Sequence, residues 1–324
     1  MKRIKRMRIG DRILNKVLVI VGPTGVGKTQ VSLELADILQ GEVVSLDSRQ
    51  VYKYMDIGTA KPTKKEMKKV AHHLIDMVYP DEKFTAADYA KKSREAIKEI
   101  IGRKKQPILV GGSGLYLRAL IKGFFSYGSK IGQGPKADEK LRERLKREES
   151  EFGPYYLFEK LKKVDPKAAQ RIHPNDLVRI IRALEVYELT GKPITSLQEK
   201  GDYDRFEMDL IKVGLTLDRK KLYERIDRRV EKMISEGFLK EVKELKKKGY
   251  SSELKAFKTV GYQELFSYLE GKIDFPTAVE RIKLNTHHYA KRQLTWFRKD
   301  EEIKWVDAEK DDLIELILKY FREN

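Results

Sequence analysis

The feature that most constrains the fold of this chain is an apolar strand that runs directly into a glycine-rich loop. Residues 17–21 read Val-Leu-Val-Ile-Val, and residues 22–29 follow as Gly-Pro-Thr-Gly-Val-Gly-Lys-Thr. In this GxxxxGKT spacing, glycines let several backbone N–H groups converge on one anion, and the lysine adds a mobile positive charge. A helical pattern follows, as the motif requires. The pattern predicts a bound di- or triphosphate, held by Gly22, Pro23, Thr24, Gly25, Val26, Gly27, Lys28 and Thr29, with a Mg²⁺ ion on the Thr29 hydroxyl.

The charge balance indicates a polyanionic partner. The chain has 68 Lys and Arg against 50 Asp and Glu, a formal net charge of +18 over 324 residues. Such a surplus favours nucleic acid as the partner, although a lysine-rich, solvated surface would give the same count. The absence of cysteine excludes disulfides, thiolate zinc sites and cysteine nucleophiles. No apolar run is long enough to span a bilayer, so we expect a cytoplasmic protein without membrane contact.

Apolar β-branched runs alternate with helical patterns along most of the chain, which predicts an α/β fold with a parallel sheet. The expected strands are 18–21, 43–46, 74–78, 108–110, 210–217 and 303–306. Helical patterns at 30–39, 64–70 and 86–101 separate the first four strands. Together with the motif at residues 22–29, this alternation predicts a P-loop NTPase-like parallel sheet flanked by helices.

A change of composition after Gly123 predicts an inserted all-helical domain. Residues 126–135 are rich in glycine and read as a hinge, and residues 137–163 are dense in charge. Asp176 can cap an amphipathic helix that ends at Gly191. The predicted organisation is therefore a first part of the core at 1–124, a helical insertion that contacts the polyanion at 125–200, and completion of the core with C-terminal helices at 201–324.

Two loops after predicted strands carry the remaining chemistry. Asp47 follows the second strand, and residues past the carboxyl ends of parallel strands line the ligand crevice. Asp47 is therefore a candidate general base or Mg²⁺ partner, with a helix cap or turn as the alternative role. Gly111 and Gly112 follow the fourth strand, where ATP-hydrolysing enzymes place an aspartate. Their presence weakens the ATPase interpretation and allows a backbone or a flat base to approach closely.

Five motifs occur in order and together cover nearly the whole chain. They are Asp47-Ser-Arg-Gln-Val-Tyr52, Asp56-Ile-Gly-Thr-Ala-Lys-Pro62, His72-His-Leu-Ile-Asp76, Gly111-Gly-Ser-Gly-Leu-Tyr116 and Lys291-Arg-Gln-Leu-Thr-Trp-Phe-Arg298. With the P-loop, this set resembles the tRNA dimethylallyltransferase family.

The resemblance implies a reaction. In that family the P-loop holds the diphosphate of dimethylallyl diphosphate, and the exocyclic amine of the adenosine 3′ to the anticodon displaces it. The developing charge on the leaving group would be met by the P-loop amides, Lys28 and a Mg²⁺ ion at Thr29. Asp47 is the carboxylate that would assist the amine. Arg225 resembles the family's arginine near the diphosphate, with a helix-surface charge as the alternative. A monomer suffices for this chemistry.

The resemblance also implies a set of tRNA contacts. Thr59 and Lys61 are expected close to the target base, and Ser113 stands where the family has threonine. In the helix expected to carry the last motif, the lysines fit a solvated basic face, and a functional role is therefore expected more for Arg292 and Gln293 than for those lysines. A P-loop nucleoside-phosphate kinase and a free-adenylate isopentenyltransferase remain the alternative functions. The expected tRNA-binding residues are Asp47, Ser48, Arg49, Gln50, Ser113, Arg142, Gln170, Arg171, Ile172, His173, Pro174, Lys258, Thr259, Val260, Gly261, Tyr262 and Gln263.

Overall fold

The computed structural model describes residues 16–123, 135–200, 206 and 208–323. Within them the chain divides into two compact units, 1–120 with 207–324 and 121–206. The expected insertion at 125–200 falls inside the second unit, and the hinge at 126–135, apart from Pro135, lies outside the described residues. Among the described residues, none of the helices combines the length and apolar character that crossing a membrane requires.

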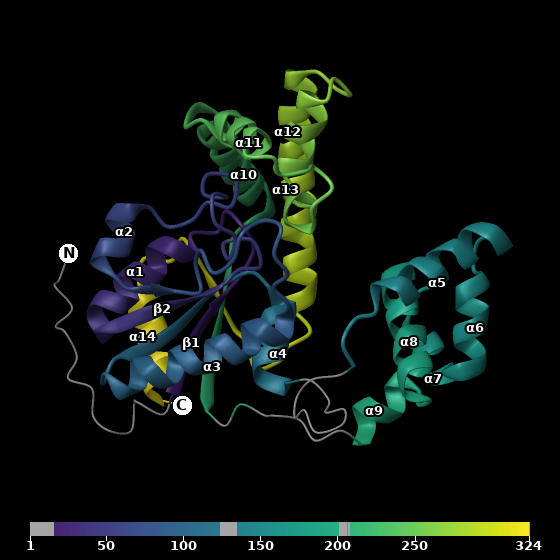
Figure 1. Ribbon diagram of the computed structural model, residues 1–324. Coiled ribbons are helices and arrows are strands. Elements are labelled where there is room, and N and C mark those ends of the chain that lie inside the picture. Colours follow the sequence, from purple (N-terminus) through teal and green to yellow (C-terminus); the bar gives the residue numbers. More distant parts are fainter. Residues whose placement is uncertain (1–15, 124–134, 201–205, 207, 324) are drawn as a thin grey trace. The chain divides into compact units, whose positions relative to one another are not determined.

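The first unit is built on a six-stranded sheet in which every pairing is parallel. The strand order is β3-β2-β4-β1-β5-β6, so β1 lies in the middle and is buried on both faces (Figure 1). This confirms the predicted α/β class. The strands are β1 (Lys16–Val21), β2 (Gly41–Leu46), β3 (His72–His73), β4 (Gln106–Gly111), β5 (Asp209–Thr216) and β6 (Lys304–Asp307).

The predicted strand at 74–78 is wrong. The strand at this position, β3, contains only His72 and His73, and Val78 makes a single isolated bridge to Tyr52. Leu74 and Asp76 have φ angles of +63° and +56°, a left-handed conformation that cannot continue an extended strand. The apolar run was misleading because it marks a partly buried turn.

Helices cover the sheet and fix its core. α1 (Lys28–Leu39) and α3 (Ala86–Gly102) pack on β2 and β4, and α14 (Leu313–Glu323) packs on β5 and α1. Thr63 begins α2 (Lys64–Lys69) and Thr85 begins α3, each with a capping box. α4 (Gly114–Lys122) follows β4. The helices expected at 30–39, 64–70 and 86–101 are confirmed within two residues at their ends.

Four further helices of this unit stand together in Figure 1: α10 (Arg219–Ser235), α11 (Phe238–Lys247), α12 (Tyr262–Leu269) and α13 (Phe275–Phe297). α13 packs against both α10 and α12, and α11 packs against α10 and α12. A short 3₁₀ helix, η1 (Lys255–Phe257), precedes α12. The register of the sheet aligns Val21 and Leu46 with Gly111, so the loops that leave β1, β2 and β4 begin at one edge.

The second unit is helical and has its own apolar core, which includes Leu145, Leu161, Ile180 and Leu184. Its helices are α5 (Glu139–Phe152), α6 (Tyr156–Val164), α7 (Pro166–Arg171), α8 (Leu177–Thr190) and α9 (Ile194–Lys200). The Asp176 side chain caps α8 and Gly191 ends it with a φ of +67°, as the sequence predicts.

Candidate active site

The loop between β1 and α1 wraps around the lysine at the end of the GxxxxGKT motif. Gly25 and Gly27 have φ angles of +83° and +106°, which L side chains rarely adopt. Lys28 Nζ donates to the carbonyl of Gly22 at 2.9 Å and to that of Pro23 at 2.7 Å. The loop therefore holds its own ammonium group next to the amides that the motif presents to an anion.

The electrostatics of Lys28 link the P-loop to two other elements. Burial, together with the nearby Arg229 guanidinium, lowers the pKa of Lys28 to about 7, and the Asp47 carboxylate acts in the opposite direction. Burial also lowers the pKa of Arg229, against the effect of Asp47. The Asp47 carboxylate thus favours the charged forms of Lys28 and Arg229, and an anionic ligand would also favour the protonated form of Lys28.

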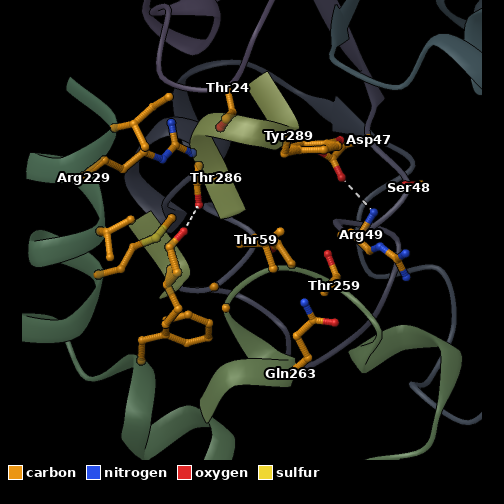
Figure 2. A pocket seen from close by; sticks show the side chains of 18 of the residues that line it. Thr24, Asp47, Ser48, Arg49, Thr59, Arg229, Thr259, Gln263, Thr286 and Tyr289 are labelled. Carbon is orange, nitrogen blue, oxygen red and sulfur yellow. Dashed lines mark hydrogen bonds between the residues drawn. The ribbon is translucent and has the colours of Figure 1, made fainter. Parts of the chain in front are cut away.

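A cavity of about 450 Å³ opens beside the P-loop, within the size range of small-molecule sites (Figure 2). Figure 2 shows Thr24 on one side, with Thr259 and Gln263 on the opposite side. The lining residues come from the P-loop, the segments after β2, the start of α12, and helices α10, α11 and α13. They are Thr24, Asp47, Ser48, Arg49, Gly58, Thr59, Ile226, Arg229, Val230, Met233, Phe238, Lys258, Thr259, Val260, Gly261, Gln263, Ile282, Thr286, Tyr289 and Arg292.

Asp47 has the turn role that the sequence left open, and its general-base role stays a prediction. Its Oδ1 accepts from the backbone N–H of Arg49 at 2.7 Å and of Gln50 at 3.3 Å, so it fixes the turn after β2. It also lines the cavity, where Figure 2 shows it beside Tyr289. The turn bonds orient a carboxylate toward the cavity, which is the placement that a general base needs.

The structure places the Arg225 side chain in an ion pair outside the cavity lining. Its guanidinium pairs with Glu309 Oε1 at 2.9 Å, and Arg225 is not among the residues that line the cavity. Arg229, one helical turn further along α10, lines the cavity. Residues four apart lie on neighbouring turns, and here only the second of the two faces the P-loop. The role of Arg225 near the diphosphate stays a prediction, and Arg229 is a second candidate for that role on the same helix.

The match to a known family agrees with this geometry. The model of the IPP transferase family matches residues 50–300, which is most of the chain. The chain belongs to the IPP transferase family. It is 47% identical over 311 residues to a tRNA dimethylallyltransferase of Caldanaerobacter subterraneus subsp. tengcongensis, covering 94% of this chain and 97% of that protein. A tRNA dimethylallyltransferase of Geobacter sulfurreducens is 46% identical over 308 residues, which cover 94% of this chain and 97% of that protein.

Solved structures of the family share the fold. The crystal structure of the full-length tRNA isopentenylpyrophosphate transferase from Bacillus halodurans is 42% identical. Its TM-score is 0.68, and the match covers 95% of this chain and 97% of that one. A eukaryotic dimethylallyltransferase acting on tRNA is 31% identical, with a TM-score of 0.74. That match covers 90% of this chain and 74% of the other. A P-loop-like sheet is thus the framework of this family member.

Several predicted contact residues surround the cavity, whereas others support it. Thr59 lines it with Ser48, Arg49 and five of the six residues at 258–263. Gln50 lies behind, where its amide accepts from Ser45 Oγ at 2.9 Å and donates to Ala60 O at 3.2 Å. Lys61 is buried and donates to Asp56 Oδ1 and Asp76 Oδ1 at 2.6 and 2.5 Å. These two side chains hold the loop rather than face the cavity.

Ser113 and Tyr262 are also absent from the lining residues. The backbone N–H of Ser113 donates to Leu46 O at 3.1 Å, which joins the ends of β4 and β2. Tyr262 is fully buried, and its hydroxyl donates to Glu241 Oε1 at 2.6 Å. Both residues therefore make hydrogen bonds within the protein and do not line the cavity.

In the second unit, the predicted contact residues differ in their surroundings. Arg142 forms a two-bond pair with buried Glu185, at 2.8 and 2.9 Å, which is a structural role within that unit. Gln170, Arg171 and His173 are exposed around the end of α7, whereas Ile172 and Pro174 are half-buried. The exposed residues are available to a partner, and Arg142 is engaged.

Gln293 and Tyr289 of α13 received no specific role from the sequence. Gln293 is buried; its Oε1 accepts from Thr24 N at 2.9 Å and its Nε2 donates to Gly112 O at 3.0 Å. A Cβ at Gly112 would lie 2.0 Å from that Nε2, so a larger residue there would displace the Gln293 amide. Burial raises the pKa of Tyr289, and Asp47 adds to the effect, so the phenol stays neutral beside the carboxylate. The sequence signal for Gln293 was its position as a polar residue on the apolar face of α13.

Among the described residues, no group of three His, Cys, Asp or Glu side chains could hold a metal ion alone. Thr29 is exposed at the start of α1. The Thr29 hydroxyl oxygen suits Mg²⁺ when diphosphate oxygens supply the further ligands. Thr29 therefore fits an ion that binds together with the diphosphate.

The two arginines of α10 make a matched pair for a test. We expect Arg229→Ala to raise the KM for dimethylallyl diphosphate by about tenfold or more, because it removes a poorly solvated charge from the phosphate side. Arg225→Ala, which breaks a partly exposed ion pair with Glu309, should change this KM by less than about twofold. Steady-state kinetics with varied donor measure both. A larger effect at Arg225 would return the diphosphate role to that residue.

Proposed function

We propose that this chain transfers a dimethylallyl group from dimethylallyl diphosphate to the exocyclic amine of the adenosine 3′ to the anticodon in tRNA. The observation that carries the proposal is one cavity with an anion-binding end and a carboxylate. Asp47 and Arg229 both line the space, and the charges of both side chains act on the pKa of Lys28. Relatives covering 94% of the chain, named tRNA dimethylallyltransferases, support the same activity.

The proposed step forms one bond and breaks one. The amine nitrogen attacks the first carbon of the dimethylallyl group, and the bond from that carbon to the diphosphate oxygen breaks. The P-loop amides, Lys28 and Arg229 stabilise the charge that develops on the leaving diphosphate. Asp47 accepts the proton that the amine loses. An Mg²⁺ ion at Thr29 would supply further positive charge to the diphosphate oxygens.

The acceptor nucleoside must leave its base stack to reach this space. A cavity lined on one side by Thr59, Thr259 and Gln263 offers hydroxyl and amide groups to the edges of a base. We propose that tRNA and dimethylallyl diphosphate are the two substrates and that the protein acts as a monomer.

The test is incubation of the protein with Mg²⁺, labelled dimethylallyl diphosphate and unmodified tRNA. We expect label in tRNA, at the adenosine 3′ to the anticodon, with release of diphosphate. Parallel reactions contain adenosine monophosphate as the acceptor, or ATP in place of the donor. Label in the free nucleotide but not in tRNA would favour a free-adenylate enzyme, and consumption of ATP would favour a kinase.

The positive charge of the chain predicts steep salt dependence of tRNA binding. Each phosphate neutralised adds roughly 0.7 to 0.9 to the slope of log affinity against log salt. Arg171→Ala should weaken tRNA binding and flatten this slope, because Arg171 is exposed in the helical unit. Donor affinity should stay unchanged. Lys319→Ala on α14 is the control, since Lys319 is an exposed cation of the first unit and not of the helical unit. A flat wild-type slope would assign the surplus charge to surface solvation.

A further inference from the structure

The carboxylate of Glu241, on α11, accepts four hydrogen bonds from two other segments. Its Oε2 accepts from the backbone N–H of Asp56 at 2.9 Å and of Ile57 at 2.7 Å. Its Oε1 accepts from the N–H of Gly58 at 3.2 Å and from the hydroxyl of Tyr262 at 2.6 Å. Three successive backbone donors that converge on one carboxylate form an anion-binding nest, occupied here by the protein's own side chain.

The surroundings of this carboxylate leave little freedom. A Cβ at Gly58 would lie 2.2 Å from the ring of Phe238 and 2.6 Å from that of Tyr262. Those two rings meet edge to face at 5.0 Å. Burial and the Glu241 carboxylate raise the pKa of Tyr262 well above its usual value, so its hydroxyl remains a donor. The 56–58 backbone, α11 and the start of α12 are therefore joined at one charged group.

The segments that Glu241 joins form the cavity wall opposite the P-loop. Gly58 and Thr59 lie on the first segment, and Gly261 and Gln263 flank Tyr262 on the second; all four line the cavity. In Figure 2, Thr59 and Gln263 lie on this side, away from Thr24. Glu241 itself does not line the cavity and makes none of the contacts that hold the P-loop.

We propose that Glu241 is a positioning residue for the acceptor nucleoside: it holds Thr59 and Gln263 in register across the cavity and leaves the diphosphate side unaffected. The inference rests on the proposed function, because that function supplies the acceptor. A change at Glu241 should then act on the tRNA substrate separately from the donor, although Glu241 touches neither.

The test compares Glu241→Gln with Glu244→Gln, an exposed glutamate of the same helix. Glutamine keeps the size of the side chain, but its NH₂ group must face either the Asp56 and Ile57 donors or the Gly58 donor. We expect Glu241→Gln to raise the KM for tRNA about tenfold, with the KM for dimethylallyl diphosphate within about twofold of wild type. Glu244→Gln should match wild type in both constants.

A merely structural role gives a different result. Loss of folded protein lowers the apparent kcat and leaves both KM values unchanged, and that outcome would overturn the inference. An equal rise in both KM values would also overturn it. If Glu241→Gln does not fold, Tyr262→Phe decides: it removes one of the four bonds, and we expect a smaller rise in the tRNA KM alone, whereas an unchanged tRNA KM would contradict us.

The two proposals fail differently. If wild type and Glu244→Gln both transfer no dimethylallyl group to tRNA, the proposed function is wrong, and the role of Glu241 falls with it. If wild type is active and Glu241→Gln keeps the wild-type tRNA KM, the inference about Glu241 alone is wrong.

Discussion

Lys28→Ala should lower kcat/KM by about a hundredfold or more, because it removes a charge aimed at the leaving diphosphate. The Lys28 ammonium group donates to the carbonyls of Gly22 and Pro23 within its own loop, so the sheet should fold normally without it. Steady-state kinetics with tRNA measure the effect, and circular dichroism verifies the fold. Lys16→Ala, at the opposite end of β1, is the control.

The lowered pKa of Lys28 adds a pH dependence to this expectation. In the free protein the ammonium loses its proton near pH 7, and a bound diphosphate would raise that pKa. Binding above pH 7 therefore takes up a proton, so donor affinity should fall as pH rises from about 7 towards the pKa of the complex. The Lys28→Ala variant should lack this component. Wild-type kinetics in Lys28→Ala, or an identical pH profile, would refute the assignment of Lys28 to the diphosphate.

Asp47→Asn should lower kcat by about two to four orders of magnitude with little change in tRNA affinity. The reason is specific to this turn. Asp47 holds the Arg49 and Gln50 amides through Oδ1, and the amide oxygen of asparagine can keep both bonds. The turn should survive while the proton acceptor is lost. Single-turnover rates and tRNA binding, measured on the same preparation, separate the two effects.

Ser48→Ala is the matched control, because Ser48 lines the same cavity and carries no charge. Its kcat should stay close to that of wild type. If Asp47→Asn instead abolishes tRNA binding and retains the rate of bound substrate, Asp47 is a docking residue. The role of general base would then pass to another group.

The local elements of the core could be predicted because each one follows from local chemistry. The first strand is apolar from Val17 to Val21, and the helix after it begins at the lysine of the motif. Thr63, Thr85 and Asp176 cap the helices that they precede. The prediction of a strand at 74–78 was wrong because an apolar run does not indicate the left-handed backbone conformation at Leu74 and Asp76.

The features of the site also differ in whether local sequence could predict them. By itself, the sequence determined the P-loop, the place of Asp47 after β2 and the family, because spacing within a motif is local. Only the tertiary structure decided which arginine of α10 lines the cavity, since Arg225 and Arg229 are four positions apart on one helix and the residues around them lie far along the chain. Gln293 reaches Thr24 across 269 positions and Glu241 reaches Gly58 across 183. Such contacts follow from the packing of α11 and α13, which no local pattern specifies.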